Sequence, residues 1–111
     1  MKRLYFTNFD LAGFTYWDGV EVFDKLKIGL QLRFERELDN KYDPKAVAIY
    51  FEEYKLGYVP RATNSEIAKL CEQGYSHIFD ARINRISADE HTENQIGVVV
   101  HIINSSELQD K

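Results

Sequence analysis

A polar loop enclosed by two apolar stretches is the feature that most constrains how this chain folds. Residues 30–36 alternate apolar and polar side chains, which is typical of a half-buried β-strand. Residues 46–51 are almost entirely apolar and follow the polar segment 37–45, so they are expected to form an antiparallel partner strand. Residues 56–59 add a short strand that Pro60 ends. Three successive strands are therefore expected here, the first two joined by a polar loop.

Two further elements are expected before this segment. Residues 4–6 and 11–17 are rich in apolar and aromatic side chains and predict an N-terminal strand, interrupted or bulged near residues 8–10. Residues 20–26 fit a short helical turn, which Asp18 can cap with its side chain.

One convincing helix is expected near residues 63–73. It begins with Thr-Asn-Ser-Glu at 63–66, which fits a capping box, and Gly74 is a natural C-terminal stop. Three side chains at helical spacing form an apolar face for the core: Ile67, Leu70 and Cys71.

The remaining chain predicts two more strands, at residues 77–86 and 95–103, with a polar hairpin loop at 87–94 between them. About six strands with one main helix indicate a mainly β protein with minor α structure. Such a set of elements favours a small, partly open β-barrel or a strongly curved sheet. A chain of 111 residues has room for one core, so residues 1–111 are expected to form a single domain.

The composition is that of a folded globule, because 44% of the residues are hydrophobic and 14% are aromatic. No apolar run approaches the roughly 20 residues that span a bilayer. The N-terminus reaches Asn8 and Asp10 before the apolar core of a signal peptide can form. We therefore expect a cytoplasmic protein that does not enter a membrane.

Cys71 is the single cysteine, so no intrachain disulfide is possible, and its place on the apolar helix face favours a buried structural thiol. The three histidines have no zinc-like spacing to it: His77, His91 and His101. We expect no metal and no cofactor.

The polar loop carries the residue types that grip a nucleic-acid strand. Asn40, Tyr42 and Asp43 lie within four positions of each other, and Arg61 follows the third strand. An aromatic ring stacks on bases, a cation meets phosphates and a carboxylate accepts a hydrogen bond from a hydroxyl group. The alternative is a tight turn, because Asn, Asp and Pro build turns for purely local reasons.

The same residues resemble a known family. The run RELDNKYDPKAVAIY at 36–50, followed by KLGYVPR at 55–61, is similar to the central motif of the HIRAN domain, a module of DNA-repair translocases and of small stand-alone bacterial proteins. The segment GFTYWDG at 13–19 is similar to the family's first strand with its paired aromatic residues. Leu38 departs from the proline usual in the family. The resemblance covers about residues 10 to 85.

This resemblance implies an OB-like barrel that binds single strands across one face. It further implies a non-catalytic module that recognises single-stranded DNA at a free 3′-hydroxyl end, in DNA repair or processing. Thr15 stands where family members that bind DNA ends can carry a basic residue, so a phosphate contact is lost there. The implied nucleic-acid-binding residues are Tyr16, Asn40, Tyr42, Asp43, Tyr58 and Arg61.

The resemblance also suggests individual roles. Tyr42 would stack on the terminal base or sugar while Asp43 accepts a hydrogen bond from the 3′-hydroxyl. Tyr16 is preferred to Trp17 as a stacking residue, because neighbours on a strand face opposite sides. Arg61 would serve a phosphate.

Two other polar residues of the motif have structural alternatives. Asn40 would either hydrogen-bond a base edge or hold the loop by an Asx turn. Arg36 is expected to be structural, reaching Asp43 or Glu35.

The charge distribution limits the affinity for nucleic acid. The net charge is −4, but residues 25–61 hold eight Lys or Arg and six Asp or Glu, a local balance of +2. A locally basic site on an acidic protein binds a few phosphates without long-range attraction.

The sequence has neither a phosphate-binding loop nor a nucleophile-elbow motif, so the chain is not expected to be an enzyme. A partner protein would then supply any enzymatic activity. The competing hypothesis is a protein–protein interaction module without nucleic-acid binding. The discriminating feature is whether Tyr16, Tyr42 and Asp43 line one open pocket edged by cations.

Overall fold

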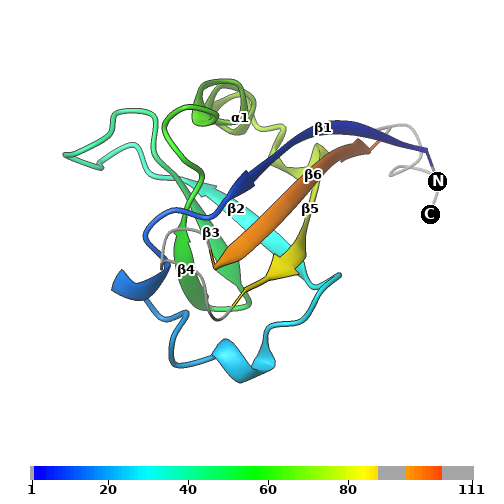
Figure 1. Ribbon diagram of the computed structural model, residues 1–111. Helices are drawn as coiled ribbons and strands as arrows, with labels where there is room; N and C mark the ends of the chain where they lie inside the picture. The colour runs from blue at the N-terminus through cyan, green and yellow to red at the C-terminus, as the bar shows by residue number, and fades with distance from the viewer. Residues whose placement is uncertain (1, 88–94, 104–111) are drawn as a thin grey trace.

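The computed structural model describes residues 2–87 and 95–103. This part of the chain forms one antiparallel sheet in the strand order β1-β6-β5-β2-β3-β4, with α1 over one end of it (Figure 1). The strands are β1 (Arg3–Asp10), β2 (Gln31–Arg36), β3 (Val47–Phe51), β4 (Tyr54–Tyr58), β5 (Phe79–Ile86) and β6 (Ile96–Ile103). The helices are α1 (Asn64–Glu72) and the short 3₁₀ turns η1 (Phe14–Tyr16), η2 (Phe23–Lys25) and η3 (Ser76–Ile78).

The sheet curls until its two ends almost meet. Directly after β1, Ala12 forms an isolated bridge with Tyr58 of β4, the strand at the other end of the order, through two backbone hydrogen bonds of 2.9 Å. No continuous ladder of the described strands closes the ring, and β2 pairs with β5 over two residue pairs only. The predicted fold, a mainly β, partly open barrel with one main helix, is confirmed.

Gly57 makes the bridge possible. Its φ of +152° lies in a region that side chains rarely adopt, and a Cβ at this position would lie 2.3 Å from the carbonyl oxygen of Ala12. Gly57, in the KLGYVPR segment, therefore allows the chain after β1 to approach β4.

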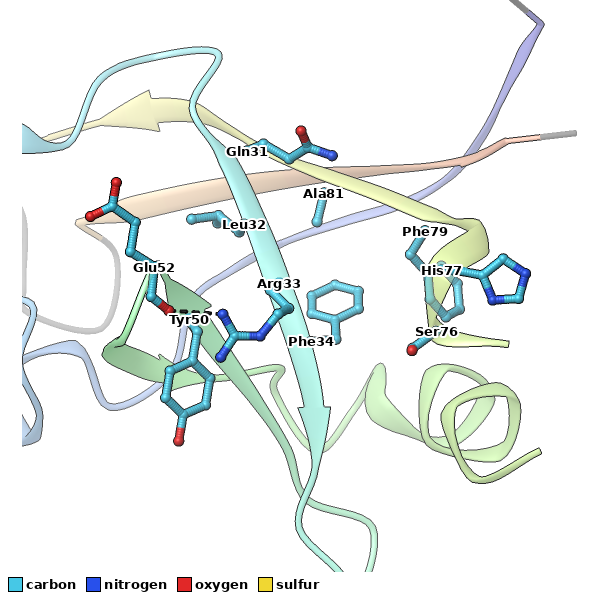
Figure 2. A pocket seen from close by; sticks show the side chains of 10 residues that line it. All are labelled: Gln31, Leu32, Arg33, Phe34, Tyr50, Glu52, Ser76, His77, Phe79 and Ala81. Carbon is cyan, nitrogen blue, oxygen red and sulfur yellow. Dashed lines mark hydrogen bonds between the residues drawn. The ribbon is translucent and has the colours of Figure 1, made fainter. Parts of the chain in front are cut away.

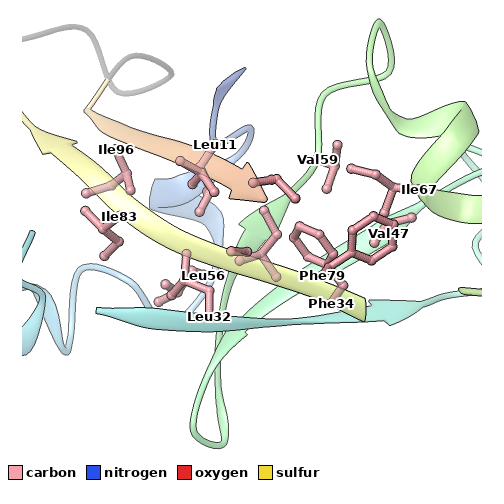
Figure 3. Packing of buried hydrophobic residues seen from close by; sticks show 14 of the residues in the cluster. Leu11, Leu32, Phe34, Val47, Leu56, Val59, Ile67, Phe79, Ile83 and Ile96 are labelled. Atoms are coloured by element: carbon pink, nitrogen blue, oxygen red, sulfur yellow. The ribbon is translucent and has the colours of Figure 1, made fainter. Parts of the chain in front are cut away.

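The core fills the space inside the curled sheet (Figure 3). Side chains from the strands meet Ile67 of α1, which is fully buried, and Leu70 and Cys71 pack at the edge of the same cluster. The apolar helix face predicted from the sequence is thus the face of α1 that packs against the core. The labelled core residues in Figure 3 are Leu11, Leu32, Phe34, Val47, Leu56, Val59, Ile67, Phe79, Ile83 and Ile96.

The N-terminal prediction was partly wrong. Residues 11–17 do not form a strand: the Ala12 bridge is followed by the 3₁₀ turn η1, because Leu11 and Phe14 are core anchors three residues apart. The bulge in β1 lies between Tyr5 and Thr7, not at residues 8–10.

A helical turn does form after Asp18, at η2, but Asp18 does not cap it. The Asp18 carboxylate instead accepts a hydrogen bond of 3.1 Å from the backbone N–H of Lys55. Asp18 thereby ties this segment to β4.

The capping box predicted at the start of α1 is absent. The Thr63 hydroxyl donates to the carbonyl oxygen of Pro60 at 3.2 Å, so it is not available to the free amides of the helix. Gly74 adopts a positive φ of +87° just after the helix, as its stop requires. The predicted hairpin loop at 87–94 lies almost wholly outside the described residues.

Candidate nucleic-acid interface

A cleft of about 570 Å³ opens on the barrel rim where the loop between β2 and β3 meets the end of β4. This loop projects from the barrel (Figure 1). The cleft is lined by Ala12, Gly13, Trp17, Glu37, Asp39, Asn40, Lys41, Tyr42, Asp43, Ala46, Tyr58, Val59, Pro60 and Arg61. Five of the six residues predicted for binding nucleic acid are among them, and Tyr16 is not.

Asn40 builds the loop. Its Oδ1 accepts hydrogen bonds from the backbone N–H groups of Tyr42 at 2.8 Å and Asp43 at 3.0 Å, which is an Asx turn. Its Nδ2 donates to Glu37 at 3.1 Å. Both ends of the amide are engaged, so the structure contains the Asx turn that the sequence left as one of two alternatives.

The turn leaves Tyr42 free and holds Asp43. The Tyr42 side chain is 86% exposed at the mouth of the cleft, and its backbone carbonyl accepts a hydrogen bond from Arg61. Asp43 is mostly covered: its Oδ1 accepts from the backbone N–H of Lys45 at 2.9 Å and its Oδ2 from Asn64 at 2.9 Å. The Arg61 Nε lies 3.7 Å from the same Oδ2.

A charged network forms the inner wall. Lys55 Nζ donates to Glu37 Oε2 and to the Tyr58 hydroxyl, both at 2.6 Å, and that hydroxyl donates to Glu37 Oε1 at 2.8 Å. Burial alone raises the pKa of Glu37, but hydrogen bonds from Lys55, Asn40 and Tyr58 outweigh it and hold the pKa below its ordinary value.

The pKa values of Lys55 and Tyr58 are shifted as well. Burial alone lowers the pKa of Lys55, but its hydrogen bonds to Glu37 and Tyr58 outweigh this and raise it. Burial is also the largest effect on Tyr58, whose pKa it raises. Lys55 is therefore a protonated cation whose charge is neutralised inside the wall.

Trp17 faces this network. The Lys55 Nζ lies 3.8 Å from the centre of the Trp17 ring, and the Trp17 and Tyr58 rings meet edge to face at 5.8 Å. Tyr16 is 82% exposed. Its ring lies beside the cleft, because a Cβ on Gly13, which lines the cleft, would be within 4 Å of both the Tyr16 and the Trp17 ring. The argument from strand alternation fails here, because Tyr16 is the last residue of the 3₁₀ turn η1 and Trp17 directly follows it.

Arg36 has the structural role expected of it, but with a different partner. Its Nε donates to Glu72 of α1 at 2.7 Å, and its other nitrogens donate to backbone carbonyl groups of the loop, including that of Ala46 at 3.0 Å. From the sequence we expect Arg36 to contact Asp43 or Glu35, but its partners are instead Glu72 and these carbonyl groups. The arginine ties the loop to the helix.

A second depression, of about 500 Å³, lies between β2 and η3 (Figure 2). Its cation, Arg33, lies 4.8 Å from the centre of the Tyr50 ring and donates to Glu35 and to the carbonyl oxygen of Glu52. The guanidinium is therefore occupied, and no residue predicted to bind nucleic acid lines this depression.

Cys71 is partly buried beside the core, and burial raises the pKa of its thiol, which disfavours the reactive thiolate. Within residues 2–87 and 95–103, no cluster of three or more His, Cys, Asp or Glu side chains could hold a metal ion. The helices in the described part of the chain are all too short or too polar to cross a bilayer.

The fold and the cleft define a small β-barrel binding domain. The chain belongs to the HIRAN domain family, whose sequence pattern matches residues 4–102. Domains of this family are binding domains linked to nucleic acid and are not themselves catalytic.

The fold also resembles a crystal structure of a protein from Lactobacillus plantarum, a structural genomics target. The two chains superpose with a TM-score of 0.72 at 21% identity, over 91% of this chain and 95% of the other. This likeness concerns the fold alone. No curated protein matches the chain in sequence.

Proposed function

We propose that this HIRAN domain binds single-stranded DNA at a free 3′-hydroxyl end, as a non-catalytic module in DNA repair or processing. The observation that carries the proposal is the position of Asp43. Its carboxylate lies in the wall of the cleft, 3.7 Å from the Nε of Arg61, and the preceding residue, Tyr42, exposes its ring on the same cleft. An acceptor, a stacking surface and a cation thus line one cleft.

The terminal nucleotide would enter with its base against the rings and its sugar at the carboxylate. Tyr42 supplies one stacking face, and the Trp17 and Tyr58 rings supply further aromatic surface in the cleft. The carboxylate is a good acceptor for a 3′-hydroxyl and repels a phosphate, which separates a free end from a continuing strand. Tyr16, exposed beside Gly13, offers a surface to the next base.

Few phosphates can be neutralised here. Lys41 and Arg61 are the cations that line the cleft, and three carboxylates line it with them: Glu37, Asp39 and Asp43. The Lys55 charge is already balanced by Glu37 at 2.6 Å. The affinity should therefore depend on stacking and on the terminal hydroxyl more than on the length of the strand.

Fluorescence anisotropy of a labelled oligonucleotide with a free 3′ end, measured at several salt concentrations, tests the proposal. Two neutralised phosphates predict a slope of log affinity against log salt of about −1.4, from about 0.7 per phosphate for single strands. Arg61→Gln should reduce the slope by about 0.7. Lys69→Gln removes an exposed cation on α1 and should leave it unchanged.

Absence of binding at low salt would remove the nucleic-acid hypothesis. The carboxylates of the cleft and the net charge of −4 then favour the second candidate, a protein-interaction module. Under either hypothesis, any enzymatic activity would come from a partner protein.

A further inference from the structure

Asn64, the first residue of α1, is 2% exposed and is one of two buried polar side chains in the described part of the chain, with Asp80. Its Nδ2 lies 2.9 Å from Asp43 Oδ2, 21 residues away. An ionised carboxylate can only accept hydrogen bonds, so the amide must present its NH₂ group to Asp43. The helix thus places a buried donor directly behind a residue of the cleft.

The contact fixes the orientation of the carboxylate. The backbone N–H of Lys45 holds Oδ1 at 2.9 Å and Asn64 holds Oδ2, so each oxygen has one donor from the protein. Two oxygens offer about four acceptor positions, so a carboxylate whose rotation is restrained by these two hydrogen bonds keeps acceptor capacity for a ligand. Fixing the acceptor before binding removes the cost of ordering it on binding.

A second link joins the same two segments without touching Asp43. Lys45 Nζ donates to the Ser65 hydroxyl at 3.1 Å, one residue along the helix, and this contact is exposed. The chain therefore offers a matched pair: Asn64 and Ser65 both tie the loop to α1, and only Asn64 contacts the carboxylate.

We infer that Asn64 is a positioning residue for end recognition: it orients the Asp43 carboxylate so that the cleft distinguishes a 3′-hydroxyl from a 3′-phosphate. The inference rests on the proposed function, and it assigns specificity to a helix residue that does not line the cleft.

The test compares the affinities for two oligonucleotides that differ only in a 3′-hydroxyl or a 3′-phosphate. Asn64→Leu keeps the approximate size of the side chain and removes the donor without adding a charge. The affinity for the 3′-hydroxyl end should fall about tenfold, because the Asp43 carboxylate loses one of the two donors that orient it. The affinity for the 3′-phosphate end should change little, because the charge of Asp43 is unaltered.

Ser65→Ala is the matched control and should keep the preference of the unsubstituted protein for the 3′-hydroxyl end. A measurement on the unsubstituted protein does not depend on how a variant folds: the side-chain NH₂ signal of Asn64 in ¹H–¹⁵N spectra should shift with the 3′-hydroxyl oligonucleotide and stay in place with the 3′-phosphate one.

The outcomes separate the two proposals. If the unsubstituted domain prefers the 3′-hydroxyl but Asn64→Leu retains that preference, the inference is overturned and the proposed function stands. An equal loss of affinity for both ends would also overturn it, because Asn64 would then only support the loop. If the unsubstituted domain shows no preference, the proposed end recognition fails and the inference fails with it.

Discussion

The ammonium group of Lys55 lies 3.8 Å from the centre of the Trp17 ring, which places the cation against the aromatic wall of the cleft. The same nitrogen is 2.6 Å from Glu37. Trp17 is the single tryptophan of the chain, so its fluorescence reports on this wall. The contact connects the stability of the rim to an optical signal from the candidate site.

Lys55→Met should destabilise the domain by about 2 kcal/mol, because it leaves the partly buried Glu37 carboxylate without its charged donor. It should also change the Trp17 fluorescence of the folded state. Urea unfolding followed by circular dichroism gives the first quantity. Lys45→Met, at an exposed lysine, is the control and should cost much less. Equal stability of the two variants would show that the network does not stabilise the rim.

The pH dependence of stability follows from Glu37. Its pKa is below the ordinary value of 4.5 in the folded state, so its contribution is fully present above about pH 4.5 and is lost as the pH falls through the folded-state value. Glu37→Gln should therefore be less stable than the unsubstituted protein at pH 7, and the difference should narrow towards pH 3. Urea titrations at both pH values measure it. A difference that stays constant would mean that the Glu37 carboxylate titrates alike in both states.

Gly57→Ala should destabilise the domain by more than the roughly 1–2 kcal/mol that a positive φ alone costs, since the new methyl group would meet the Ala12 carbonyl at 2.3 Å. Gly29→Ala is the matched control: Gly29 has a φ of +92° but no atom within 4 Å of a Cβ. Denaturant midpoints compare the two. If both variants lost the same stability, the Ala12–Tyr58 bridge would be able to move away from the new methyl group without a loss of free energy.

Strands and helices could be predicted from the sequence where their apolar and polar residues follow a local periodic pattern. Residues 30–36 alternate because one face of β2 packs in the core, and the sequence shows that alternation directly. Residues 11–17 were wrongly predicted as a strand. Leu11 and Phe14 are buried, but they lie in and next to a turn, and the spacing of two apolar residues does not distinguish such a turn from a strand. The capping box at Thr63 failed because the Pro60 carbonyl competed for the hydroxyl.

The candidate site was predictable only in its local part. Asn40, Tyr42 and Asp43 lie in one loop, so their grouping is visible in the chain. Lys55 and Asn64 do not line the cleft but contact Glu37 and Asp43, which do, from positions 18 and 21 residues away, and no local pattern marks them. For Asn64 the sequence shows only an asparagine at the start of a predicted helix, which is equally typical of a capping residue.

Tyr42→Ala should reduce the affinity for single-stranded DNA by about 1–3 kcal/mol, the usual contribution of one stacked base. Because the ring is 86% exposed, the stability of the domain should hardly change. Tyr75→Ala removes another exposed tyrosine, outside the cleft, and should leave binding unaltered. Anisotropy titrations compare the variants. If both tyrosines contribute equally, binding is not centred on the cleft.

The most direct test of the central claim is the affinity of the unsubstituted protein and of Asp43→Asn for two oligonucleotides that differ only in a 3′-hydroxyl or a 3′-phosphate. The account predicts that the unsubstituted protein prefers the hydroxyl end and that Asp43→Asn narrows the preference, because an amide does not repel a phosphate. Equal affinity of the unsubstituted protein for both ends would contradict the account.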